Sequence, residues 1–190
     1  MAKTKKKTAV KAESKMSTIR IWAVLRLLMG VIFLWPFFDK MIGLGYTTCL
    51  TADPISKVES VEVLCKKSAA KGGSPTTGFL KFAAKGPLKE TYNNLAGNKI
   101  VDVLFMSGLL LIGLSLLTGV GVKIAAVSGV LLMLLMWSAV LPGENNPVLD
   151  DHIIYAVVLL GIMKSNKEQV WGLGKWWQKQ PIVKKYPILA

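Results

Sequence analysis

Residues 103–141 read VLFMSGLLLIGLSLLTGVGVKIAAVSGVLLMLLMWSAVL, a stretch with no acidic residue and one basic residue, Lys123. As continuous helix, at about 1.5 Å per residue, it would reach nearly 60 Å, roughly twice the ~30 Å hydrocarbon core of a bilayer. Gly119, Gly121 and Lys123 interrupt it near its middle, where glycine loosens a helix and lysine indicates a turn in water. The stretch therefore predicts two transmembrane helices, residues 100–119 and 123–141. A buried helical hairpin of a soluble protein is the alternative, and the length of the apolar runs favours the membrane.

Two further apolar segments predict the remaining helices. Residues 21–44 predict a first transmembrane helix, and a cleaved signal peptide is the alternative because a basic segment precedes it. Residues 147–163 predict the fourth helix, with Asn146 as its N-cap and Pro147 at its first position. The expected fold is all-α: an integral membrane four-helix bundle over residues 20–165.

The connection between the first and second helices is a long polar segment, residues 46–98, which we expect to form an extracytoplasmic loop. Within it, residues 87–95 predict a short amphipathic helix on the membrane surface, with a plain linker as the alternative. Cys49 and Cys65 lie in this loop and predict a disulfide, since an exported loop is in an oxidising setting. A reactive redox pair is the alternative, and neither cysteine has the spacing of a metal ligand.

The 190 residues carry a formal net charge of +13. Such a charge indicates nucleic acid in a soluble protein, but here the lysines lie mostly in the tails and the loop. Contact with anionic lipid head groups is the simpler interpretation, and we expect no nucleic-acid partner. Residues 1–19 predict a disordered basic tail, and residues 166–190 predict a basic, tryptophan-rich tail along the membrane. Because lysine and arginine are more numerous in the tails than in the loop, we expect a multi-pass cell-membrane protein with both termini cytoplasmic.

Polar residues at the outer ends of the helices predict a pocket. Four helices of alternating direction bring the end of the first and the starts of the second and fourth to one side. The residues at this level are Asp39, Lys40, Asp102, Glu144, Asp150, Asp151 and His152. Carboxylates crowded at low dielectric repel one another and need a cation, a proton or a ligand. We therefore expect an outward-facing polar pocket that passes protons or binds a polar head group such as a quinone ring.

A local role for each of these residues is the alternative to a shared pocket. An acidic residue in the first turn of a helix complements the helix dipole, which would account for Asp102, Asp150 and Asp151. Asp39 and His152 are the best candidates for function, because a dipole role explains Asp39 least and histidine changes its charge near neutral pH. The sequence identifies no catalytic residue.

Four motifs together resemble those of a known family. They are GVIFLWPFFDKMIGLG (30–45), GSPTTGF (73–79), LAGNKIVD (95–102) and LPGENNPVLDDH (141–152). The pattern resembles prokaryotic DoxX-family membrane proteins over residues 20–186. This resemblance implies a four-helix membrane bundle. It also implies a link to the DoxD/DoxA type of thiosulfate:quinone oxidoreductase, in which related subunits pass electrons to quinone.

Three functions compete at this point. The first is a DoxX-like membrane partner or subunit of an envelope redox complex, favoured because the sequence has no complete catalytic motif. The alternative is a quinone-reducing membrane subunit of a thiosulfate:quinone oxidoreductase-like enzyme. One histidine and two cysteines are too few to hold haem or an iron–sulfur cluster, so quinone is the one cofactor considered. A small proton-linked transporter ranks third, because the chain has no internal repeat. Expected partners are the lipid bilayer and a membrane protein.

Overall fold

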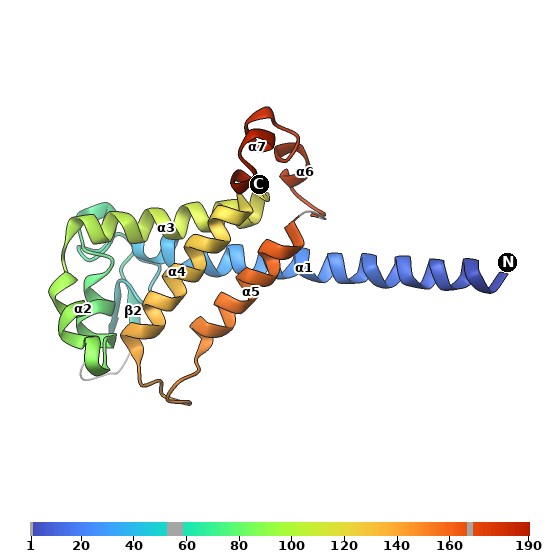
Figure 1. Ribbon diagram of the computed structural model, residues 1–190. Helices are drawn as coiled ribbons and strands as arrows, with labels where there is room; N and C mark the ends of the chain where they lie inside the picture. Colours follow the sequence, from blue (N-terminus) through green and yellow to red (C-terminus); the bar gives the residue numbers. More distant parts are fainter. Residues whose placement is uncertain (1, 53–58, 167–168) are drawn as a thin grey trace.

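Four long helices form the body of the protein. The computed structural model describes residues 2–52, 59–166 and 169–190. The four helices are α1 (Ala2–Ile42), α3 (Lys99–Thr118), α4 (Val122–Val140) and α5 (Asp151–Ser165). Both α1 and α4 pack against α3 and α5, so the four helices close a ring around one core (Figure 1). Phe33, Leu116, Val122 and Leu159 lie at its centre, almost or completely buried.

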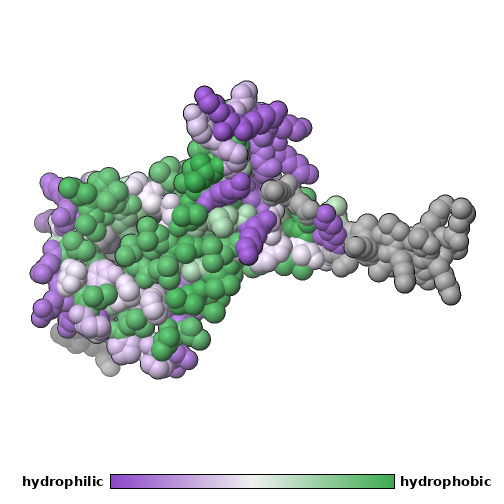
Figure 2. All heavy atoms as spheres, viewed as in Figure 1, coloured by the Kyte–Doolittle hydropathy of each residue, from purple (hydrophilic) through white to green (hydrophobic). Residues whose placement is uncertain are grey.

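Three helical segments are long and apolar enough to cross a membrane. They are Lys15–Ile42, Lys99–Thr118 and Val122–Val140. The last two lie within one residue, at each end, of the hairpin that the sequence predicts. Figure 2 shows apolar residues gathered over the body of the helices, with hydrophilic residues at the end near α2 and on the C-terminal segment. This distribution is the one that a bilayer requires of the protein surface around it.

Small residues allow the helices to approach closely. A Cβ atom added to Gly30 would lie 3.2 Å from the carbonyl oxygen of Gly113, and one added to Gly113 would lie 3.1 Å from that of Gly30. The backbones of α1 and α3 are therefore nearly in contact. Between α4 and α5, a Cβ atom at Gly129 would lie 2.8 Å from Leu159. Close packing of this kind holds helices together in lipid, where no hydrophobic effect acts between them.

The start of α1 differs from the prediction. The sequence predicts a disordered tail over residues 1–19, whereas α1 begins at Ala2. The tail consists largely of strong helix formers, and no glycine or proline occurs before Gly30. Because extending an existing helix is easier than nucleating one, the apolar part of α1 can propagate toward the N-terminus.

The start of α5 also differs from the prediction. The fourth helix begins at Asp151 and not at Pro147, because its N-cap is Asp150. The Asp150 Oδ1 accepts hydrogen bonds from the amides of residues 152 and 153, at 3.1 and 3.4 Å. Asn146 instead accepts hydrogen bonds from the amides of residues 148 and 149, both at 2.9 Å, which forms a local turn.

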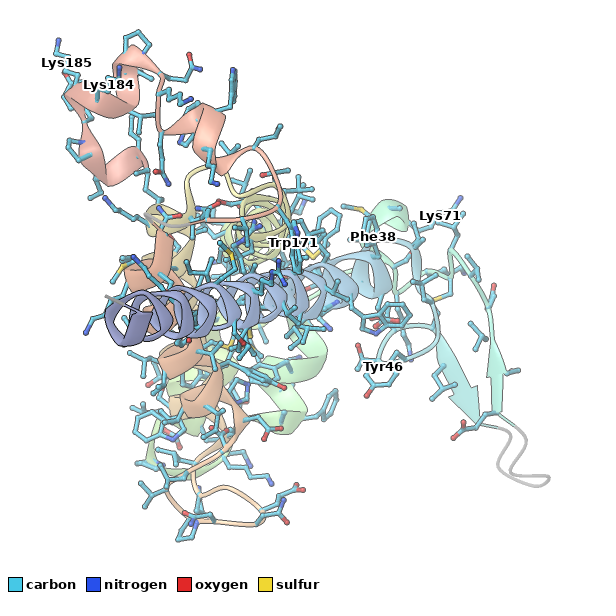
Figure 3. All side chains as sticks on the ribbon, turned by 90° about the vertical axis from the view of Figure 1, so that its right-hand side faces the viewer. Phe38, Tyr46, Lys71, Trp171, Lys184 and Lys185 are labelled. Carbon is cyan, nitrogen blue, oxygen red and sulfur yellow. A yellow bond between two sulfur atoms is a disulfide. The ribbon has the colours of Figure 1, made fainter. Side chains whose placement is uncertain are left out.

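The segment between α1 and α3 contains a small sheet and several short helices. Strands β1 (Leu50–Ala52) and β2 (Glu59–Val61) pair antiparallel, with Leu50 opposite Val61, and the all-α prediction did not include them. A disulfide joins Cys49 to Cys65, with their Cα atoms 5.8 Å apart. The sheet extends sideways from the helices, with Tyr46 near its base (Figure 3).

Four short helices complete this segment before α3. They are η1 (Ala69–Lys71), the π-helix η2 (Phe79–Ala83), η3 (Gly86–Leu88) and α2 (Lys89–Leu95). Together η3 and α2 cover the residues for which the sequence predicts an amphipathic helix.

The C-terminal segment folds back onto the turn between α3 and α4. It contains α6 (Gly174–Trp177), α7 (Pro181–Lys185) and η5 (Pro187–Leu189). The Leu173 amide donates to the Thr118 carbonyl at 2.7 Å, and Lys123 Nζ donates to the Pro187 carbonyl at 2.7 Å. Lys184 and Lys185 lie at the far end of this segment (Figure 3). The lysine in the hairpin turn therefore helps to fix the C-terminal segment.

Candidate functional site

Asp39, near the end of α1, holds the chain that follows the helix. Its side chain is 1% exposed. One carboxylate oxygen accepts from the Tyr46 amide at 3.1 Å, and the other accepts from the amide and hydroxyl of Thr47 at 3.0 and 2.6 Å. Lys40 donates to the same Thr47 hydroxyl at 3.1 Å. The buried carboxylate is thus satisfied by three donors from the loop that leads to the disulfide.

Asp102, in the first turn of α3, likewise holds a second stretch of the loop by hydrogen bonds. Its Oδ1 accepts from the Ser74 hydroxyl at 2.9 Å and from the amide and hydroxyl of Thr76 at 3.2 and 2.6 Å. The N-cap of α3 is Asn98, which accepts from the Ile100 amide at 2.9 Å. Asp102 is therefore engaged in fastening residues 74–76 to α3, besides its favourable position in the helix dipole.

Two acidic residues near α5, Asp150 and Glu144, have partners of their own. The second carboxylate oxygen of Asp150 lies 2.7 Å from His152 Nδ1, so the cap of α5 also orients the imidazole. Glu144 forms an exposed ion pair with Lys85 at 3.1 Å. Asp151, the first residue of α5, is exposed. An exposed ion pair such as Glu144–Lys85 contributes little to stability.

The hydrogen bonds and ion pairs of six of the seven residues of the predicted pocket fall into separate groups. The structure brings Asp39 and Lys40 together at Thr47 and pairs Asp150 with His152, while Asp102 and Glu144 have other partners. Within the described part of the chain, no group of three or more His, Cys, Asp or Glu residues has an arrangement that could hold a metal ion. A single pocket shared by all seven residues stays a prediction.

A large apolar groove lies elsewhere, between α3 and α4. We name it the lateral groove; its volume is about 500 Å³. Leu104 and Gly108 of α3 line one side, and Leu131 and Leu135 of α4 line the other. All three leucines are also among the exposed large hydrophobic residues, so the groove opens on the apolar flank of the helices. A Cβ atom added to Gly108 would meet nothing within 4 Å, so this glycine contributes to the width of the groove.

The loop before α3 covers one end of the lateral groove. Leu80 of η2 and Tyr92 of α2 line it there, together with Thr76, the residue that Asp102 holds. The Tyr92 hydroxyl lies 2.6 Å from the Ser138 hydroxyl and donates to the Leu135 carbonyl at 3.0 Å. These bonds tie α2 to α4. The groove is therefore open toward the surrounding apolar surface and roofed at the end where the loop lies.

Comparison with protein-family models, with curated proteins and with solved structures gives no match. The DoxX-type resemblance therefore rests on the four motifs alone. Two of them contain the residues that fasten the loop, since Asp39 lies in the first motif and Asp102 in the third.

The lateral groove could not be predicted from the sequence, because it depends on which faces of α3 and α4 are not packed against each other. Gly108 lies near one face with Ser115 and Gly119, a pattern that predicts close packing and no cavity. The contact in fact occurs at Gly113, which meets Gly30, whereas Gly108 faces open space. A glycine that packs against another helix and a glycine that faces open space cannot be told apart in a sequence, because the position of the neighbouring helix decides between them.

Proposed function

We propose that this protein is an integral membrane protein that holds the apolar chain of a lipid-soluble quinone in the lateral groove. In this role it serves as a DoxX-like partner, or quinone-binding subunit, of an envelope redox complex. The observation that carries the proposal is the groove itself: a cavity of about 500 Å³ that is lined mostly by apolar side chains and opens on the flank of two candidate membrane spans.

The proposal includes a fourth crossing of the bilayer by α5. This helix has 15 residues, shorter than the other three segments, but it packs between α1 and α4. Ile154 and Val157 on its outer face are 57% and 62% exposed, as expected of side chains in contact with lipid. Four crossings place both termini on one side, and the basic residues of the tails favour the cytoplasm.

A quinone suits the groove because its two parts need different surroundings. The long isoprenoid chain needs an apolar channel that it can reach from the bilayer, and the exposed leucines at the opening provide one. The ring needs a few polar groups, and the residues at the roofed end include Tyr92 and Thr76, whose hydroxyls are held in place by hydrogen bonds to the Leu135 carbonyl and to Asp102. Ligand sites usually combine a mainly apolar lining with a small number of placed polar groups.

The test is a substitution that places a large side chain in the groove. A Cβ atom at position 108 would meet nothing within 4 Å and Gly108 lines the groove, so Gly108→Phe introduces a ring at the wall of the groove. We expect the purified parent protein to retain decylubiquinone, and the variant to retain it with roughly tenfold lower affinity, equal to a loss of about 1.4 kcal/mol. The measurement is chromatographic quantification of the quinone that stays bound after detergent exchange.

Leu111→Phe is the matched control. It introduces the same side chain in the same helix at a position that is 64% exposed and does not line the groove. Equal retention by both variants, or no retention by the parent, would contradict the proposal.

A second candidate function is a membrane partner that binds no quinone and docks another protein through the loop. The observation in its favour is that Val61, Val63 and Leu64 are exposed on the disulfide-tied segment, at 49%, 56% and 43%. Exposed apolar residues gathered in one segment are typical of interaction surfaces. Co-purification of a stable partner by a parent protein that retains no quinone would favour this second function over the first.

A further inference from the structure

The C-terminal segment, residues 169–190, lies outside the three candidate spans and is folded as one unit. The Leu173 amide donates to the Thr118 carbonyl at the end of α3, at 2.7 Å, and the Lys123 amide near the start of α4 donates to the Ala190 carbonyl, at 2.9 Å. Inside the segment, the Trp177 indole N–H donates to the Leu189 carbonyl at 2.6 Å. These bonds attach both parts of the segment to the turn between two candidate spans.

This attachment places the segment at the level where the apolar part of the helices ends. Thr118 is the last residue of the span Lys99–Thr118, and Lys123 is the second residue of the span Val122–Val140. Figure 1 shows the segment to one side of the helical body, and Figure 3, which looks along α1, shows it extending away from the helices toward Lys184 and Lys185. In a bilayer that α1 crosses, a direction sideways from α1 runs along the membrane surface. The segment would then lie over the lipid beside the protein.

Large apolar and aromatic side chains are exposed along this segment. Six of them are 51–67% exposed: Trp171, Leu173, Trp176, Ile182, Tyr186 and Ile188. They lie outside the candidate spans, so contact with the bilayer core does not account for their exposure. Tryptophan and tyrosine prefer the membrane interface, where the ring body meets apolar groups and the polar end meets water. Trp177 differs from Trp171 and Trp176, because its ring is half-buried and its N–H has a partner within the segment.

Positive charge accompanies these side chains. The segment has no acidic residue and four lysines, all of them exposed: Lys175, Lys179, Lys184 and Lys185. Among the residues that the structure describes, no carboxylate forms an ion pair with any of the four. Anionic lipid attracts lysines near the membrane surface, and each of them strengthens binding by about fivefold. The charge of the segment is therefore complementary to that of an anionic leaflet.

We infer that the C-terminal segment binds the anionic lipid surface of the leaflet at which the α3–α4 turn lies. Its lysines contact the lipid phosphates, and its exposed apolar side chains enter the level of the glycerol groups. Nucleic acid would also suit lysines and aromatic rings, but it accounts neither for the exposed Leu173, Ile182 and Ile188 nor for the attachment at the ends of two spans. The inference rests on the membrane insertion of α3 and α4, and it is independent of quinone binding in the lateral groove.

The experiment follows one position of the segment in nanodiscs that hold the full chain. Ile182→Cys in α7 carries an environment-sensitive fluorophore, on a background whose two cysteines are bonded to each other. The nanodiscs contain phosphatidylcholine alone or phosphatidylcholine with phosphatidylglycerol, and both include a lipid with a nitroxide quencher at its headgroup. We expect quenching to be at least about twofold stronger with phosphatidylglycerol, and the difference to disappear in about 1 M salt, where the Debye length is about 3 Å. Equal quenching with both lipids at low salt would overturn the inference.

Two fourfold variants separate the segment from the general charge of the protein. The test variant is Lys175→Gln, Lys179→Gln, Lys184→Gln, Lys185→Gln, and it should be quenched equally with both lipids, because four contributions of about fivefold are lost. The matched control removes four exposed lysines of the loop and has the same net charge: Lys66→Gln, Lys67→Gln, Lys71→Gln, Lys81→Gln. The control should respond to phosphatidylglycerol as the parent does. A response that the test variant retains, or that both variants lose equally, would overturn the inference.

Trp176→Ser tests the apolar contribution. The side chain is 58% exposed, so the substitution should leave the thermal stability in detergent unchanged, yet it should weaken quenching in the nanodiscs that contain phosphatidylglycerol. Quenching equal to that of the parent would contradict the contact between this side chain and lipid. Single-stranded RNA is added as a competitor, and release of the fluorophore from these nanodiscs by RNA would make the partner a nucleic acid and overturn the inference. Gly108→Phe should leave all these values unchanged, so failure of the quinone proposal is recognised separately.

Discussion

At the scale of single residues, two aspartates perform the same task at the ends of two helices. Asp39 and Asp102 each accept the amide and the hydroxyl of one threonine, Thr47 in the first case and Thr76 in the second. Hydrogen bonds to a carboxylate are about twice as strong as those between neutral groups. Each carboxylate therefore fastens a loop segment to the helix that carries it.

The position of Asp39 indicates that its carboxylate needs hydrogen-bond partners, but the sequence does not reveal which residues provide them. A buried carboxylate near the end of an apolar helix must be satisfied, and this follows from its position alone. The partners lie in the loop, however, and the path of a long loop is not encoded in any local pattern. The loop supplies the donors for both Asp39 and Asp102.

Asp39→Asn tests this role. The amide has only one acceptor oxygen, so the Thr47 amide or the Tyr46 amide loses its partner. We expect the free energy of unfolding to fall by about 2 kcal/mol, measured by denaturation in mixed micelles. Glu144→Gln is the control, because it breaks an ion pair that is exposed on both sides and should change stability by at most about 0.5 kcal/mol. If the Asp39 variant is as stable as the control, the carboxylate does not fasten the loop.

At the scale of the elements, α1 and α3 approach each other closely where they cross. This approach depends on Gly30 and Gly113, which leave no room for a side chain on either helix. The hairpin of α3 and α4 could be predicted almost to the residue, because apolar length and a glycine turn are local signals. The start of α5 could not, because Asn146 and Asp150 are both good N-caps and only the fold of the turn selects between them.

Two alanine substitutions in α3 test the crossing. In Gly113→Ala the added methyl would lie 2.6 Å from Leu34 Cγ and 3.1 Å from the Gly30 carbonyl oxygen, and we expect a loss of about 1–3 kcal/mol. In Gly108→Ala the methyl meets nothing within 4 Å, so the gain in helix propensity should stabilise the protein by about 0.5–1 kcal/mol. The same denaturation assay compares the two. Equal effects would mean that α1 and α3 do not cross at Gly113.

At the scale of the whole molecule, the number of crossings decides which surfaces share a side of the membrane. Three candidate spans are evident from length and composition, and the fourth crossing rests on the packing of α5 against α1 and α4. With four crossings the basic C-terminal segment lies opposite the disulfide-tied loop. With three crossings, the C-terminal segment and the loop would lie on the same side of the membrane.

Single cysteines at two lysine positions distinguish these arrangements. The parent is a clean background because its two cysteines are bonded to each other. Lys89→Cys lies in α2, Lys184→Cys lies in α7, and both positions are exposed. We expect a membrane-impermeant maleimide to label Lys89→Cys in intact cells, and Lys184→Cys only after permeabilisation. Labelling of both in intact cells would show that α5 does not cross, and the reverse pattern would invert the orientation.

Because the loop closes one end of the lateral groove, the affinity for quinone must be referred to the quinone concentration in the bilayer. Asp102 holds Thr76 against α3, and Tyr92 holds α2 against α4, so the loop closes the end of the groove while its leucine-lined flank stays open. A ligand therefore arrives sideways, already dissolved in lipid. The relevant concentration is its mole fraction in the bilayer, and the aqueous concentration matters only through the partition coefficient. Consider two quinones that have the same ring and whose chains are both longer than the groove. Their affinities should be equal when the quinone concentration is given as mole fraction in the bilayer. When the concentration in water is used instead, their binding free energies should differ by about 0.8 kcal/mol for every additional methylene.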